Sequence, residues 1–192
     1  MGAAKATRRR GTALEEAILE AAWRELAERG YAEFTLDGVA SRAGTSRPVL
    51  HRRWSGRPEL AKAALVYHQL QHPISVPDLG SVREELISLL RQLSTRGAPT
   101  IAVVILGMSG YFAETKSSFA DLKREITGKN LIDEILQRGI ARGEIAAEKL
   151  TPRIASLPVD LARQEVMMTL EPVPDKVVEE IVDEIFLPLV LR

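Results

Sequence analysis

The sequence predicts an all-α protein of about nine helices. Apolar residues recur at a spacing of three to four along most of the chain, which is the period of an amphipathic helix. Prolines, glycines and side chains able to cap helices divide this pattern into segments of helical length. The Val/Ile-rich run 101–108 could equally be a buried strand. Because no other segment reads as a strand to pair with it, we expect a buried central helix there.

Composition excludes several classes of protein. The 192 residues contain no cysteine, so disulfides, thiolate catalysis and cysteine metal sites are impossible. The start, MGAAKATRRRG, has no apolar signal region, and the run 101–108 is far too short to span a bilayer. We therefore expect a cytoplasmic protein that does not enter the membrane. Its formal charge is zero, but residues 1–60 carry +3 and residues 61–192 carry −3.

The first sixty residues contain a basic arm and a first helix. Residues 2–11 are basic and small, and we expect a solvated tail, with an arm that follows a DNA groove as the alternative. Thr12 and Glu15 have the spacing of a capping box. The helical pattern that follows them extends to Gly30, so this segment predicts a helix that packs across the next two.

Two short helices are predicted next, around a tight turn. Thr35 can cap the first, and Gly44 can end it. Ser46 is a candidate cap for the second, where Pro48 suits the first turn because its missing N–H would be unpaired there. Two helices joined by three or four residues that include a glycine form a helix-turn-helix unit, whose second helix fits the DNA major groove.

The charge of this segment supports nucleic-acid binding. Residues 42–57 contain no acid and five arginines, at positions 42, 47, 52, 53 and 57. A basic run alone is often just a solvated face. Here it coincides with the turn and the second helix, so we interpret it as a surface for phosphates.

Five further helices are predicted after a connecting helix. Pro58 opens the connecting helix, which Pro73 ends, and Ser81 and Glu84 form a second capping box. The later helices are expected at 81–97, 99–113, 118–142, 152–170 and 174–191. The predicted domains are a helix-turn-helix domain with its basic arm (1–57), a connecting helix (58–73) and a helical ligand-binding and dimerisation domain (78–192).

The last helix has an apolar stripe too wide for a helix that covers only its own domain. This stripe favours a homodimer, and a central core helix in a monomer is the alternative. Methionines and aromatic residues in 90–119 could line a small apolar cavity or simply form the core. His68 and His72 have a metal-compatible spacing without a suitable third ligand, so surface histidines are the better interpretation. No enzyme motif and no cofactor-binding motif is present.

Residues 30–65, GYAEFTLDGVASRAGTSRPVLHRRWSGRPELAKAAL, resemble the DNA-binding domain of the TetR/AcrR family of bacterial transcriptional repressors. His51, Trp54, Arg57 and Pro48 depart from that pattern, in which Tyr, Phe, Lys and Gly or Ala are usual. The remaining two thirds of the chain are similar to the family in size, in helical pattern and in the turn before the last helix.

The resemblance implies a dimeric repressor that binds a palindromic double-stranded DNA operator and is released by a small hydrophobic effector, with no cofactor. A helix-turn-helix protein without a ligand and an all-helical enzyme are the alternatives. The residues implied at base edges are Ser46, Arg47, Pro48, Val49 and Arg52, and those at phosphates are Thr35, Thr45, His51, Arg53 and Arg57. The ligand-binding residues expected are Leu90, Leu93, Val104, Met108, Tyr111, Phe112, Phe119 and Met167. The dimer residues expected are Leu161, Met168, Val178, Val182, Ile185, Phe186 and Leu189.

Overall fold

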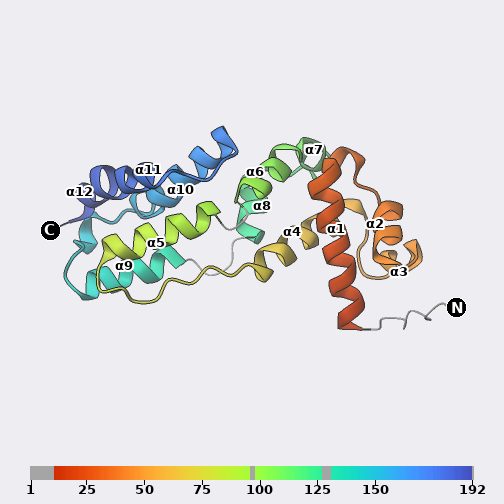
Figure 1. The fold of residues 1–192 in the computed structure, drawn as a ribbon, viewed down its shortest axis with the longest axis horizontal. Helices are drawn as coiled ribbons and strands as arrows, with labels where there is room; N and C mark the ends of the chain where they lie inside the picture. Colours follow the sequence, from red (N-terminus) through yellow and green to blue (C-terminus); the bar gives the residue numbers. More distant parts are fainter. Residues whose placement is uncertain (1–10, 96–97, 127–130, 192) are drawn as a thin grey trace, which may run out of the picture. The chain divides into compact units, whose positions relative to one another are not determined.

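The computed structural model describes residues 11–95, 98–126 and 131–191, and these confirm the all-α prediction (Figure 1). The basic arm expected at 2–11 lies, except for Gly11, outside the described residues. The chain forms two compact units. The first contains α1 (Thr12–Glu33), α2 (Leu36–Ala43), α3 (Arg47–His51), α4 (Arg57–Gln71), α7 (Ser109–Thr115) and α8 (Phe119–Ile126). The second contains α5 (Val82–Thr95), α6 (Ala98–Leu106), α9 (Leu131–Ala141), the 3-10 turn η1 (Ala147–Lys149), α10 (Pro152–Thr169), α11 (Asp175–Glu179), the π-helical η2 (Glu180–Phe186) and α12 (Leu187–Val190).

The division into units differs from the expected domains in the middle of the chain. The helix expected at 99–113 is two helices, α6 and α7, which are separated at Gly107 and Met108. The α7 helix packs on α1 and α4, and α8 packs on α4, so Gly107–Ile126 belongs to the first unit. The single helix expected at 118–142 is likewise described as α8 and α9. Its middle, residues 127–130, lies outside the described residues.

The first helix begins and ends differently from the prediction. Gly11 (φ 64°) precedes α1, and no side chain caps this end, so the Thr12–Glu15 capping box is not formed. Glu15 instead forms an ion pair with Arg53. At Gly30 (φ 70°) the helix is kinked rather than ended, because glycine tolerates this left-handed backbone. The chain continues to Glu33, and the kink leaves Tyr31 buried.

The second unit is built around α5, α9, α10 and the last helical segment. Its core includes the fully buried side chains of Leu86, Leu90 and Phe186. The predicted cap at the start of α5 is confirmed, since the Glu84 N–H donates to Ser81 Oγ at 3.2 Å. The last segment changes to π-helix before Pro188, and a proline can cause this because it has no N–H and its ring crowds the preceding turn.

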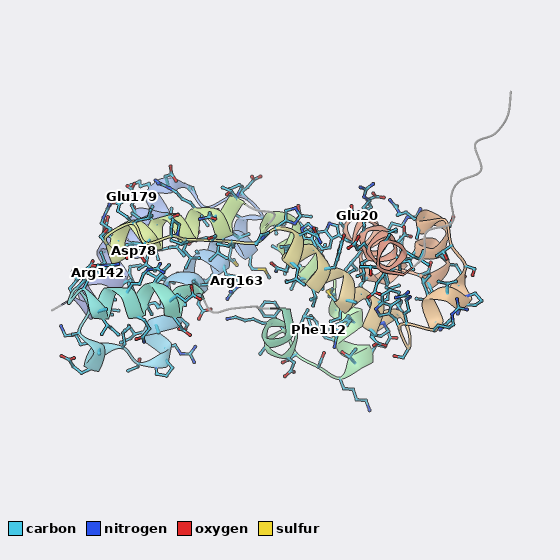
Figure 2. The ribbon with its side chains drawn as sticks, turned by 90° about the horizontal axis from the view of Figure 1, so that it is seen from below. Glu20, Asp78, Phe112, Arg142, Arg163 and Glu179 are labelled. Atoms are coloured by element: carbon cyan, nitrogen blue, oxygen red, sulfur yellow. The ribbon has the colours of Figure 1, made fainter. Side chains whose placement is uncertain are left out.

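A buried ion cluster fixes the segment that leads into α5. The fully buried carboxylate of Glu85 accepts from Arg138 Nε at 2.7 Å and lies 3.0 Å from Arg142 Nη2. The same two arginines reach the preceding segment, with Arg138 Nη2 donating to the Val76 carbonyl and Arg142 Nη1 lying 3.0 Å from Asp78 (Figure 2). The sequence pattern gave no sign of this cluster, because it placed these charges on solvated helix faces.

Candidate nucleic-acid interface

The helix-turn-helix geometry is held by the residues that the sequence singled out, with one difference. Thr35 Oγ1 accepts from the Gly38 N–H at 3.0 Å and so caps α2. Gly44 ends this helix in the left-handed conformation (φ 66°, ψ 38°). Ser46 occupies the capping position of α3, but its side chain makes no capping hydrogen bond. Leu50 is fully buried and anchors α3, which leaves the rest of this helix at or near the surface.

Arg42 supports this fold and is less available for DNA than its place in the basic run suggested. It donates to the buried Glu25 at 3.1 Å and, through two nitrogens, to Glu28 at 2.6 and 3.0 Å. The hydrogen bond from Arg42 holds the pKa of Glu28 below its usual value. Because both acids lie on α1, these contacts tie α2 to α1. Gly38 leaves room for the Glu25 carboxylate, since a Cβ there would lie 2.4 Å from its Oε1.

Exposed polar and cationic side chains gather on and after α3. Arg47 donates to Asp37 at 3.1 Å and to His51 Nε2 at 3.2 Å, and its side chain remains 54% exposed. Arg52 is exposed and, within the described part of the chain, has no ion pair. The residues of the predicted site that are exposed are Thr35, Ser46, Arg47, Pro48, His51, Arg52 and Arg53, whereas Thr45, Val49 and Arg57 are half-buried.

Arg57 belongs to a cluster with Tyr31 and Glu114, called here the Arg57 cluster. Its guanidinium lies 2.5 Å from Glu114 Oε2 and 4.4 Å from the centre of the Tyr31 ring. The Tyr31 hydroxyl donates to the same oxygen at 2.8 Å. The hydrogen bonds from Arg57 and then Tyr31 lower the pKa of Glu114, and burial raises the pKa of Tyr31. The sequence did not link Glu114 to the basic segment, from which it is 57 residues distant.

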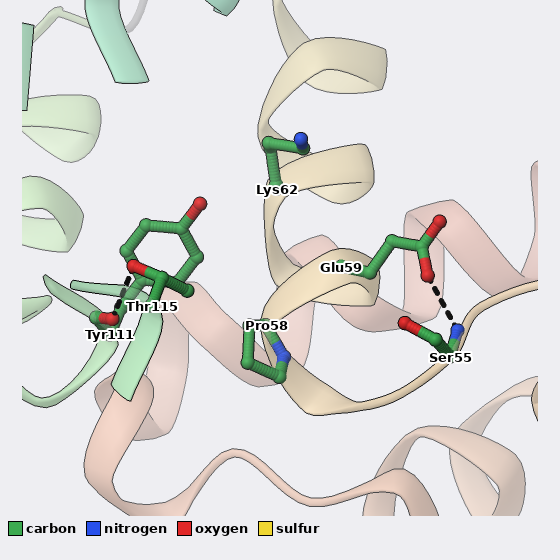
Figure 3. A pocket seen from close by; sticks show the side chains of 6 residues that line it. All are labelled: Ser55, Pro58, Glu59, Lys62, Tyr111 and Thr115. Carbon is green, nitrogen blue, oxygen red and sulfur yellow. Dashed lines mark hydrogen bonds between the residues drawn. The ribbon is translucent and has the colours of Figure 1, made fainter. Parts of the chain in front are cut away.

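A surface pocket of about 370 Å³ lies between the start of α4 and α7 (Figure 3). Tyr111 and Thr115 come from α7, and the pocket is otherwise lined by Ser55, Pro58, Glu59 and Lys62. The Ser55 N–H donates to Glu59 at 2.5 Å. Of the predicted ligand-binding residues, Tyr111 alone lines this pocket. The pocket is therefore more polar than the cavity that we expected.

The predicted ligand-binding residues divide between the two units. Leu90 is fully buried in the core of the second unit, where Leu93 and Met167 pack against the same core. Tyr111, in the first unit, meets Tyr31 and Phe112 edge to face, with ring centres 5.5 and 5.4 Å apart. The second unit also contains Val104, and the first also contains Met108 and Phe119.

The predicted dimer residues also separate into two groups. Val178, Val182 and Phe186 are fully buried in the core of their own unit, so they are not available to a partner. The wide stripe is explained in part by α5 and α10, which cover these three side chains. The others keep exposed surface, from half-buried Leu161 to Ile185 (41%), Leu189 (44%) and Met168 (78%).

The histidines show no metal site. Among the described residues, no group of three or more potential ligands could hold a metal ion. His68 stacks on Trp23, with ring centres 3.8 Å apart, so it helps to pack α4 on α1. None of the described helices is both long enough and apolar enough to cross a membrane.

Comparison with known proteins agrees with this geometry. Residues 18–64 match the family described as bacterial regulatory proteins, tetR family. Residues 76–185 match the tetracyclin repressor-like C-terminal domain. The DNA-binding transcriptional repressor TetR of Mycobacteroides abscessus is 30% identical to this chain, covering 94% of it and 96% of the relative. An uncharacterized HTH-type transcriptional regulator of Mycobacterium bovis is also 30% identical, over 93% of this chain and 88% of the relative.

Solved structures show the same fold. The flavonoid-responsive regulator FrrA superposes with a TM-score of 0.63 at 20% identity, covering 93% of this chain and 97% of its own. The fatty acid degradation regulator FadR from Bacillus halodurans gives a TM-score of 0.60 at 18% identity, covering 94% and 97%. With the capped helix-turn-helix and both domain matches, the chain belongs to the TetR family of transcriptional regulators and has its helix-turn-helix DNA-binding domain.

Proposed function

We propose that this regulator is a repressor that binds a palindromic operator as a homodimer and leaves it when a small hydrophobic effector binds. The observation that carries the DNA-binding part is the exposed α3 helix with Arg47 and Arg52 beside it. A helix of this kind reads base edges in the major groove. Two copies would read half-sites about one DNA turn apart, roughly 34 to 36 Å.

We assign base edges to Ser46, Arg47, Pro48, Val49 and Arg52, and phosphates to Thr35, Thr45, His51, Arg53 and Arg57. The exposure of most of these side chains supports this division. Arg47 leaves Asp37 when it binds a base, and because that ion pair is largely exposed its loss costs little.

The test is Arg47→Ala, measured on a sequence selected by the protein from random DNA and on an unselected duplex. A base-reading arginine should lose about 1 to 3 kcal/mol on the selected sequence and little on the other. Arg24→Ala is a matched control, since Arg24 is an exposed arginine on α1 paired with Glu20. Equal losses on both DNAs would show that Arg47 contacts phosphates instead.

The dimer interface proposed here uses the apolar side chains that the protomer leaves exposed. Met168 and Leu189 supply such surface on α10 and α12, together with Ile185 and half-buried Leu161. Burying apolar surface drives association at roughly 25 cal/mol per Å² before the costs of binding. Sedimentation at micromolar concentration should give a dimer, and a monomer would contradict the proposal.

The effector is proposed to be neutral and largely hydrophobic. Among the residues proposed to bind it are Leu90, Leu93, Val104 and Met167 in the second unit, which carry no charge that could pair with an anion. Met108, Tyr111, Phe112 and Phe119 of the first unit complete the proposed set. The solved relatives described as flavonoid-responsive and as a fatty acid degradation regulator support this chemistry.

The effector is tested by thermal stabilisation and by release from DNA. A flavonoid and other neutral hydrophobic compounds should do both, whereas dicarboxylates and phosphorylated metabolites should do neither, because an unpaired buried charge costs several kcal/mol. A tenfold release requires about 1.4 kcal/mol of preference for the state that does not bind DNA. Release by an anion alone would refute this effector class, and no response to any compound would favour a helix-turn-helix protein without a ligand.

A further inference from the structure

The Arg57 cluster uses the donors of an arginine that the proposed function assigns to a DNA phosphate. Glu114 Oε2 lies 2.5 Å from Arg57 Nη2, and Tyr31 contributes both a ring face under the guanidinium and a hydroxyl that holds Glu114. The side chains of Arg57 and Glu114 are 35% and 40% exposed, and Tyr31 is almost fully buried. The pair is thus open to solvent but fixed from below.

This cluster is better ordered than the other ion pair in which a predicted DNA contact is well exposed. The Arg47–Asp37 pair has side chains 54% and 70% exposed, so it is weak and easily exchanged. Glu114 instead accepts hydrogen bonds from two side chains, which both stabilise its charged form. A carboxylate and a phosphate accept from a guanidinium in the same way.

We propose that Glu114 limits the affinity of this regulator for DNA by competing with a phosphate for Arg57. The inference rests on the proposed role of Arg57 as a phosphate contact. DNA binding then requires Arg57 to leave Glu114, and the cost of this exchange reduces the affinity for every sequence. Because Glu114 lies on α7, a movement of this helix would change how readily Arg57 is released.

The test is the affinity of Glu114→Gln for a short random-sequence duplex, measured by fluorescence anisotropy at several salt concentrations. An exposed ion pair is worth roughly 0.2 to 1 kcal/mol, so the variant should bind about 1.4- to 5-fold more tightly at low salt. The gain should shrink as salt rises, because the internal pair is then screened in the wild type too. Glu33→Gln removes the same charge from an exposed position on α1 and controls for net charge.

Two further variants make the result decisive. Glu114→Asp keeps the charge but shortens the side chain by one methylene, so it should also bind DNA more tightly, even if Glu114→Gln fails to fold. Combined with Arg57→Ala, Glu114→Gln should give no gain beyond that of Glu33→Gln.

The proposed function and this inference fail in different ways. If Arg57→Ala binds the duplex as tightly as the wild type, the phosphate role of Arg57 is wrong. If Arg57→Ala weakens binding but the Glu114 variants bind no more tightly than Glu33→Gln, or bind less tightly, Glu114 does not compete and the inference is overturned.

Discussion

Replacing Gly139 with alanine is expected to destabilise the second unit, although alanine is the better helix former. Gly139 lies in α9, where the change to alanine should by itself stabilise the helix by roughly 0.5 to 1 kcal/mol. A Cβ at this position would lie only 2.1 Å from Val82 Cγ2 and 2.9 Å from Ile145 Cδ1. Both neighbours are fully buried, so neither can turn into solvent.

The size of the effect follows from these distances. Carbon atoms in contact are ordinarily about 3.5 to 4.0 Å apart, so α5 and α9 must separate by about 1.4 Å or repack. Overpacking of a core costs roughly 1 to 3 kcal/mol. Because the gain in helix propensity opposes it, the expected net loss is about 1 to 2 kcal/mol.

Two spectroscopic probes can localise this loss during urea unfolding. Both tryptophans, Trp23 and Trp54, lie in the first unit, so their fluorescence reports that unit, whereas far-ultraviolet circular dichroism reports all helices. Gly139→Ala should lower the stability seen by circular dichroism. Adding Val82→Ala should make room for the new methyl group, so the double variant should lose less than the sum of the single losses. A Gly139→Ala protein as stable as the wild type, or strictly additive losses, would refute the close contact with Val82.

Three further outcomes are expected. Ile185→Asp should convert dimers to monomers in sedimentation without unfolding them, because this side chain is 41% exposed in the protomer; an intact dimer would exclude it from the interface. Arg42→Ala should cost about 3 kcal/mol in urea unfolding, since it removes the main partner of buried Glu25, whereas a loss below about 0.5 kcal/mol would contradict this role. Glu114 has a pKa lowered by Arg57 from 4.5, so its stabilising effect is present above about pH 4.5 and is lost as the pH falls through its folded value. Glu114→Gln should therefore weaken the dependence of stability on pH in this range, and an unchanged dependence would contradict the pairing.

The helix-turn-helix was the most predictable part of the fold because its signals are local. Thr35 bonds to an N–H three residues away, and Gly44 provides a backbone conformation that most residues avoid. The same is true of Thr151, which caps α10 at Ile154, next to the proline that suggested a helix start. In each case the residue and the group that it satisfies are almost adjacent in sequence.

Contacts between distant residues could not be predicted in this way. Glu85 is buried by Arg138 from a helix 53 residues further on, and a helical pattern alone classifies both as surface residues. Similarly, nothing local indicated that α7 and α8 would join the first unit, because an apolar pattern identifies the side that is buried but not the element that buries it.

The last helical segment shows the consequence of this limit for function. Its apolar stripe includes side chains fully buried in their own unit, such as Val182 and Phe186, and side chains that keep about two fifths of their surface exposed, Ile185 and Leu189. A stripe wider than one core needs can thus serve both a core and a partner, and the sequence cannot divide it. Burial in the protomer does divide it: a charge at 182 or 186 must unfold the unit, whereas a charge at 185 or 189 is costly only when a partner covers it. These two positions therefore test the dimer independently of the fold.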